Sequence, residues 1–147
     1  MIETLSALLS PLVAVIAATI LYWQFRLEKR RFRMDLYDKR YPVYSATMQF
    51  LSSIAQDATV SQEELFKFLR NSKDKDLLFG NDVQEYLEKL YKKGVRLNYL
   101  KKKLEHEPVG EKRTKLVEEE SDLVEWFINQ FEESKTLFGV YLKIDKK

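Results

Sequence analysis

The sequence contains no cysteine and only one histidine, His106. Without cysteine the chain cannot form disulfides, use a thiol nucleophile or bind a metal through thiolates. A single histidine excludes a metal site built from several imidazoles. His106 lies two residues before Pro108, near an expected turn, where an exposed helix end is its ordinary environment. These absences argue against the commonest catalytic and metal-binding chemistries.

Proline and glycine are also scarce, with three and four occurrences. Nothing between Pro11 and Pro42 need end a helix. Pro42 is expected to kink that helix or to begin the next one, because proline disfavours helical geometry in the residue before it. Period-two alternation is rare along the whole chain. The fold class is therefore predicted to be all-α.

No charged residue occurs over residues 4–25. As a helix this run would extend about 33 Å, enough for a hydrocarbon core of about 30 Å. It is apolar on all sides, whereas a buried helix of a globular domain is normally shorter or striped. A cleaved signal peptide would begin with basic residues and end at small ones, but this run follows Glu3 and ends in bulky aromatics. We therefore expect a retained transmembrane anchor over residues 1–25, with Tyr22 and Trp23 at the headgroup level.

All positive charge follows the uncharged run, and none precedes it. The positive-inside bias then predicts an outside amino terminus and a cytoplasmic carboxyl-terminal domain. Each cation near an anionic leaflet can add about 1 kcal/mol to binding. Anionic lipid headgroups are thus expected partners, and nucleic acid is not. The predicted membrane-interface cations are Arg26, Lys29, Arg30, Arg31 and Arg33.

Small residues recur at every fourth position of the predicted span: Ser6, Ser10, Ala14 and Ala18. Such spacing allows helix backbones to approach closely and makes these residues a candidate self-association face. Small residues are also common in spans, so incidental residues that face lipid explain the same spacing, and we favour this interpretation.

Residues 26–41 are predicted to form a basic juxtamembrane helical stalk, in which Lys39 and Arg40 pair with Asp35 and Asp38. Residues 42–147 are predicted to form one helical bundle. Within the bundle, Ser61 and Glu64 have the spacing of a capping box. After a polar break, Leu77, Leu78 and Phe79 indicate a buried plug or turn, and Asn81 or Asp82 is expected to cap a long helix.

Apolar residues at helical spacing predict two long helices on either side of Pro108 and Gly110, which would form an antiparallel hairpin. Gly94 interrupts the first helix at a cost of about 1 kcal/mol. The segment 136–147 is left open between a strand and a final helical turn. The expected core comprises Tyr44, Met48, Leu51, Leu87, Leu90, Leu97, Leu123, Trp126 and Phe127.

A lysine-rich face on the first long helix is a weak candidate for binding a phosphate-bearing anion: Lys89, Lys92, Lys93, Arg96 and Lys103. The second long helix carries several acids, among them Glu118, Glu119 and Glu120. A solvated face on which opposite charges pair across the hairpin explains the same lysines, and we favour it. The usual phosphate-binding fingerprints are absent.

No catalytic constellation is recognisable. Glu118, Glu119 and Glu120 could contact a hard cation, but consecutive helical positions point about 100° apart and cannot converge. We predict no catalytic residue, no cofactor and no metal, and we expect a chain that is not an enzyme.

Several segments resemble a family of uncharacterised bacterial single-pass membrane proteins with an N-terminal anchor and a cytosolic helical domain. The resemblance rests on MDLYDKRY at 34–41 with Val43-Tyr44, on DLLFG at 76–80, on PVGE at 108–111, on Trp126-Phe127, and on Phe138 with Tyr141-Leu142. It implies a bacterial inner-membrane location and nothing catalytic.

Two functional hypotheses follow. The first is a non-enzymatic, membrane-anchored interaction or scaffold module that recruits a cytosolic protein partner or forms a homo-oligomer. The alternative is an oligomeric membrane effector, whose bundle senses a ligand or partner and alters membrane permeability.

Overall fold

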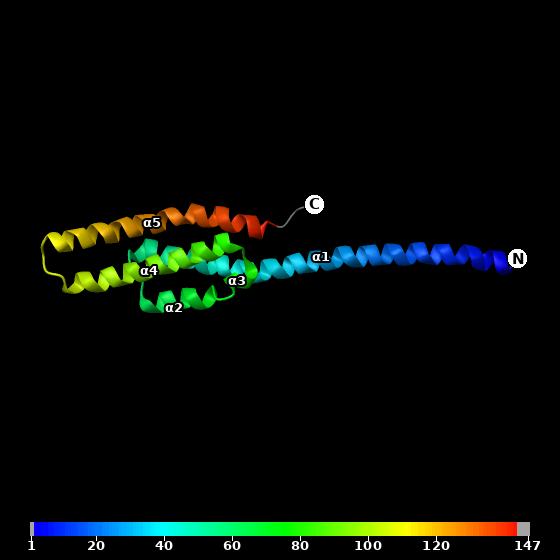
Figure 1. The fold of residues 1–147 in the computed structure, drawn as a ribbon, viewed down its shortest axis with the longest axis horizontal. Coiled ribbons are helices and arrows are strands. Elements are labelled where there is room, and N and C mark those ends of the chain that lie inside the picture. Colours follow the sequence, from blue (N-terminus) through cyan, green and yellow to red (C-terminus); the bar gives the residue numbers. More distant parts are fainter. Residues whose placement is uncertain (1, 144–147) are drawn as a thin grey trace. The chain divides into compact units, whose positions relative to one another are not determined.

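A computed structural model describes the backbone of residues 2–143 and the side chains of residues 11–143. Over this range the chain is all-helical, as predicted (Figure 1). It forms α1 (Ile2–Asp57), α2 (Gln62–Asn71), α3 (Lys75–Leu78), α4 (Asn81–His106) and α5 (Glu111–Leu142). The chain divides into two compact units, Met1–Leu36 and Tyr37–Lys147.

Helix α1 continues through Pro42 to Asp57. No new helix begins at this proline, contrary to one of the two expectations. Proline removes one backbone hydrogen bond from a helix interior, but Val43, Thr47 and Phe50 are buried in the second unit directly after it. Burial of this face outweighs the lost bond, because most helical stability in proteins comes from packing.

Within the described part of the chain, no helix combines the length and the apolar character that crossing a membrane requires. The predicted span over residues 1–25 therefore has no support from the structure and stays a prediction.

The core of the second unit is built around the contact between Phe50 of α1 and Gly94 of α4. The Phe50 ring stacks on Phe68 of α2 at 4.4 Å and meets the edge of Phe127 of α5 at 6.1 Å. A methyl group on Gly94 would lie 2.9 Å from both Phe50 Cζ and Leu65 Cδ2. Side chains of α1, α2 and α5 thus pack near Gly94, where α4 has no side chain of its own.

The expected core residues lie in this cluster. Six of them are buried: Leu51, Leu87, Leu90, Leu97, Leu123 and Phe127. The other three are partly buried and pack against it: Tyr44, Met48 and Trp126.

Helix α2 begins at the predicted capping box. Ser61 Oγ accepts from Glu64 N at 3.2 Å, and Ser61 N donates to Glu64 Oε2 at 2.7 Å. Partial burial alone would raise the pKa of Glu64, but the hydrogen bonds from Ser61 keep it below its ordinary value.

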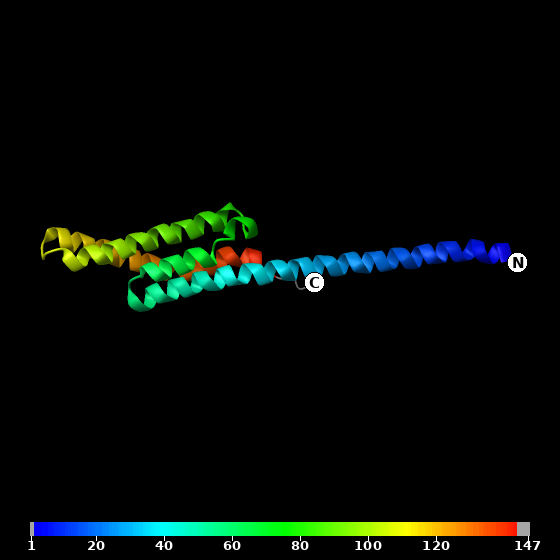
Figure 2. The same cartoon turned by 90° about the horizontal axis from the view of Figure 1, so that it is seen from below.

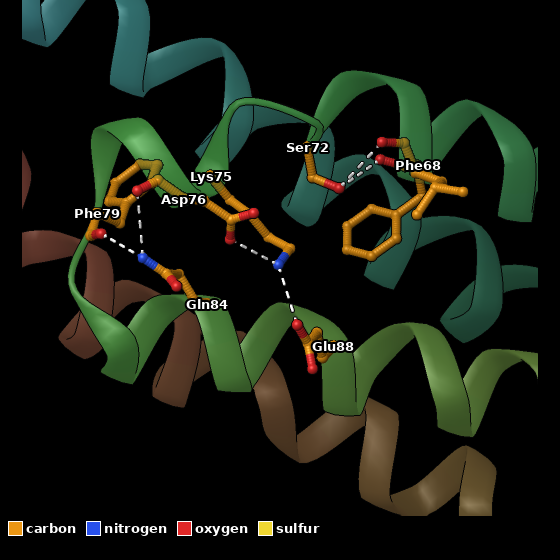
Figure 3. A network of polar contacts seen from close by, with 8 residues as sticks. Phe68, Ser72, Lys75, Asp76, Phe79, Gln84 and Glu88 are labelled. Atoms are coloured by element: carbon orange, nitrogen blue, oxygen red, sulfur yellow. Dashed lines mark hydrogen bonds and ion pairs between the residues drawn. The ribbon is translucent and has the colours of Figure 1, made fainter.

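The segment between α2 and α4 differs in part from the prediction. Phe79 is buried, but Leu77 is 86% exposed, so only one end of the expected plug enters the core. Gly80, rather than Asn81 or Asp82, is the N-cap of α4. Figure 3 shows how α3 is joined to α4: Lys75 Nζ lies 3.2 Å from Glu88 of α4 and also 3.0 Å from Asp76 of α3 itself.

Helices α4 and α5 form the predicted antiparallel hairpin, seen from two sides in Figures 1 and 2. Its connection is fixed by Arg113, whose Nη1 donates to Leu104 O at 2.7 Å and to Glu107 O at 2.6 Å. These bonds satisfy carbonyls at the end of α4 that have no helical donor. The open question about the chain end is answered as helix as far as Leu142; Ile144 lies outside the described residues.

Candidate interaction surfaces

The first unit exposes a dense set of large apolar side chains on α1. Each of them is more than half exposed, and they occupy every side of the helix: Leu12, Val13, Val15, Ile16, Ile20, Leu21, Tyr22, Trp23, Phe25 and Leu27. Soluble proteins seldom leave so continuous an apolar surface without a partner. Tyr22 and Trp23, the predicted interface aromatics, belong to this set.

The predicted interface cations follow on the same helix, and all five are exposed: Arg26, Lys29, Arg30, Arg31 and Arg33. The Lys29 ammonium lies 4.7 Å from the centre of the Phe25 ring, within cation–π range. Phe32 and Met34 are also exposed among these cations. The segment therefore offers positive charge and apolar surface together.

The candidate self-association face is only half visible. Ala14 and Ala18 are exposed, one turn apart, on α1. The side chains of Ser6 and Ser10 lie outside the described residues.

The lysine-rich face of α4 has internal partners. Arg96 donates to both carboxylate oxygens of Glu119 on α5, at 2.6 and 2.8 Å. Hydrogen bonding to Arg96 lowers the pKa of Glu119. This contact joins opposite charges across the hairpin, as the favoured interpretation of the lysine-rich face expects.

Three of the other four cations of this face lie over aromatic rings. Lys89 and Lys93 lie 5.2 and 4.7 Å from the centre of the Trp126 ring, and Lys103 lies 5.5 Å from that of Tyr99. Lys92 is exposed at a surface hollow. The cations of this face thus contact different groups. The hollow beside Lys92 also contains the acids Glu119 and Asp122.

Sequence reasoning missed the role of Arg40. Its Nε donates to Leu78 O at 2.8 Å and its Nη1 to Tyr141 O at 3.3 Å, so the expected pairing with Asp35 or Asp38 is not what holds it. The guanidinium also lies 5.8 Å from the ring centre of Phe79 and 5.2 Å from that of Tyr141. We call the end of the second unit where these parts of α1, α3 and α5 meet the bundle base.

Tyr141 extends this cluster to the start of α4. Its hydroxyl donates to Asp82 Oδ1 at 2.6 Å and accepts from Gly80 N at 3.2 Å. The hydrogen bond with Asp82 raises the pKa of Tyr141 and lowers that of Asp82. A methyl group on Gly80 would lie 2.6 Å from the Tyr141 hydroxyl, which explains glycine there.

Large apolar residues also lie exposed at the bundle base. Leu77 is 86% exposed, Val140 72% and Tyr41 47%. Their neighbours Phe79 and Phe138 are buried against each other, with ring centres 5.3 Å apart. Arg40, Phe79 and Tyr141 come from three segments singled out in the sequence, at 34–41, 76–80 and 138–142, and this was the signal available in the sequence.

A separate hollow lies on the hairpin. Its apolar wall is formed by Val117, Val124 and Ile128 of α5 together with Ala58 after α1, and Lys101 and Glu120 stand at its edge. Val117 and Ile128 are each nearly half exposed. Apolar and charged side chains thus line the same hollow.

Comparison with protein-family models, with curated proteins and with solved structures found no match.

Proposed function

We propose that this chain is a non-enzymatic, membrane-anchored interaction module, in which the N-terminal helix is held in a bilayer and the second unit recruits a protein partner. The observation that carries the proposal is the apolar surface of α1, exposed on every side and followed by five exposed cations. Full burial of one Val, Leu, Ile or Phe side chain stabilises by about 1.5–3 kcal/mol. A helix that exposes ten large apolar side chains to water is thus strongly favoured to bury them against lipid or protein.

The order of residues along the sequence favours lipid as the surroundings of this helix. The uncharged run over residues 4–25 is bounded by Glu3 and Arg26, and aromatics stand at its basic end. This order is typical of a hydrocarbon-spanning segment with an interfacial belt and a cytoplasmic cationic flank. The proposed topology places the second unit on the cytoplasmic side of a bacterial inner membrane.

The anchor is tested by alkaline carbonate extraction of the full chain in vesicles. The wild type should stay with the lipid. A variant with Val13→Arg and Ile16→Arg should move to the soluble fraction, because each cation near the centre of a span costs about 2.5–3.5 kcal/mol. The matched control, Val13→Leu and Ile16→Leu, should behave as the wild type. Release of the wild type by carbonate would contradict the anchor.

Recruitment is proposed to use the hollow on the hairpin. A photo-crosslinking residue at Val117 or Ile128, introduced into the full chain in native cells, should give one discrete protein adduct. The same residue at Thr136, exposed elsewhere on α5, should not. Adducts at the size of chain multiples would instead favour the oligomeric effector, and no site-specific adduct would contradict recruitment at this surface.

A further inference from the structure

Several polar groups of the bundle base are satisfied internally. The Arg40 guanidinium donates to Leu78 O and Tyr141 O, and the Tyr141 hydroxyl is bonded to Asp82 and Gly80. Two of the most exposed apolar residues of the second unit, Leu77 and Val140, are next to Leu78 and Tyr141 in the chain. The base therefore carries apolar side chains that the core does not use.

Only a short stretch of chain separates the second unit from the interface cations. The second unit starts at Tyr37, four residues after Arg33. A chain segment of that length spans at most about 14 Å even when fully extended. If Arg33 lies at the headgroups, Tyr37 therefore lies within about 14 Å of it.

Residues around the base combine aromatic rings with charges of both signs. Lys39 and Lys143 are exposed there, as are the acids Asp38 and Asp76. Tyr41 stacks on Tyr37 with ring centres 5.7 Å apart. Aromatic rings are favoured at the headgroup level, aliphatic side chains at its acyl boundary, and lysines near anionic lipid.

We propose that the bundle base is a second, peripheral membrane-contact surface, which places Leu77 and Val140 in the headgroup region of an anionic bilayer. The inference rests on the proposed anchor. It goes further by assigning lipid contact to the helical unit itself.

The absence of cysteine allows a clean test. Single variants Leu77→Cys, Val140→Cys and Val109→Cys of the full chain carry an environment-sensitive fluorophore and are reconstituted in vesicles of phosphatidylcholine and phosphatidylglycerol containing nitroxide-labelled lipid. Val109 is 96% exposed in the α4–α5 connection, at the opposite end of α4 from the base, and serves as the matched control. Quenching at positions 77 and 140 should exceed that at 109 at least threefold.

A second variant tests whether the contact is a shared surface. Leu77→Asp in the Val140→Cys background should reduce quenching at 140, while far-ultraviolet circular dichroism stays unchanged because Leu77 is outside the core. Equal quenching at all three labels in chains that float with the vesicles would overturn the membrane-contact surface and leave the anchor intact. Chains that do not float would contradict the anchor and this inference together. Labels at 77 and 140 that are shielded without nitroxide quenching would indicate a second copy and would also overturn it.

Discussion

Gly94 shows how one position can carry opposite local and tertiary preferences. Alanine there would gain about 1 kcal/mol of helix propensity, but its methyl group would lie 2.9 Å from Phe50 Cζ and Leu65 Cδ2. The Phe50 ring cannot move freely because Phe68 and Phe127 hold it. Overpacking typically costs 1–3 kcal/mol, so Gly94→Ala should lower the free energy of unfolding by about 1 kcal/mol in urea denaturation.

Gly139 provides the matched control within α5. A methyl group there meets nothing within 4 Å. Gly139→Ala should therefore raise the free energy of unfolding by up to about 1 kcal/mol through propensity alone. Equal stabilisation of both variants would contradict the close packing of Phe50 and Leu65 against Gly94.

Tyr86 gives the chain a pH dependence of stability in the alkaline range. Burial raises its pKa from 10.0 to about 12, although a hydrogen bond with Ser134 at 2.6 Å opposes the shift. The folded state thus holds this proton more tightly than the unfolded state. The stabilisation is fully present below pH 10 and is lost as the pH rises from about 10 to 12.

The measurement is the urea midpoint of the wild type and of Tyr86→Phe across pH 9 to 12. Lysine deprotonation contributes equally to both, so the difference between the two curves reports Tyr86. The wild type should lose stability relative to the variant above pH 10. Parallel curves would contradict a buried, neutral hydroxyl at this position.

Residue-level contacts of this kind were the least predictable from sequence. Helical periodicity identified Leu87, Leu90 and Phe127 as buried because that property follows from one helix alone. The partners of Arg40 and Tyr86 lie on helices distant in the chain, and only the tertiary fold brings them together.

At the scale of elements, Arg113 closes the α4–α5 hairpin. Its Nη1 group bonds two carbonyls at the end of α4, where positive charge is also favoured by the helix dipole. Hydrogen bonds from charged donors contribute about 1.5–3 kcal/mol. Arg113→Ala should lower the free energy of unfolding by about 2 kcal/mol and increase amide hydrogen exchange in residues 104–110.

The control is the neighbouring Lys112, whose ammonium contacts Glu107 at 3.0 Å but whose side chain is 69% exposed. Exposed ion pairs contribute about 0–1 kcal/mol. Lys112→Ala should thus change stability by less than half as much as Arg113→Ala. Equal effects would mean that charge, and not carbonyl capping, matters in this turn.

The predicted elements agree with the structure where the signal is local and continuous, as in the capping box at Ser61 and the long hairpin. A new helix at Pro42, one of two alternatives, and a cap at Asn81 or Asp82 are both wrong, for a common reason. Packing of Val43 and Phe50 carries α1 through the proline, and the Tyr141 hydroxyl occupies the space that a side chain on Gly80 would need. Both outcomes depend on other helices, which local propensity does not include.

At the scale of the whole molecule, the buried core lies entirely in the second unit. Every member of the described core cluster falls between Val43 and Phe138. The first unit adds exposed apolar surface and no buried side chain among its described residues. The described core and the proposed membrane anchor therefore lie in different stretches of the chain.

This separation predicts that residues 37–147 fold alone, with helical circular dichroism and a cooperative urea transition. A fragment that starts at the sequence-predicted boundary, residue 42, lacks the Arg40 bonds to Leu78 O and Tyr141 O and the Tyr41 ring against Tyr44. Its transition should occur at lower urea, by about 1.5–3 kcal/mol in free energy of unfolding for the charged bonds. Arg40→Gln in the longer fragment should account for most of that loss. Identical midpoints for both fragments would show that the bundle base does not stabilise the second unit.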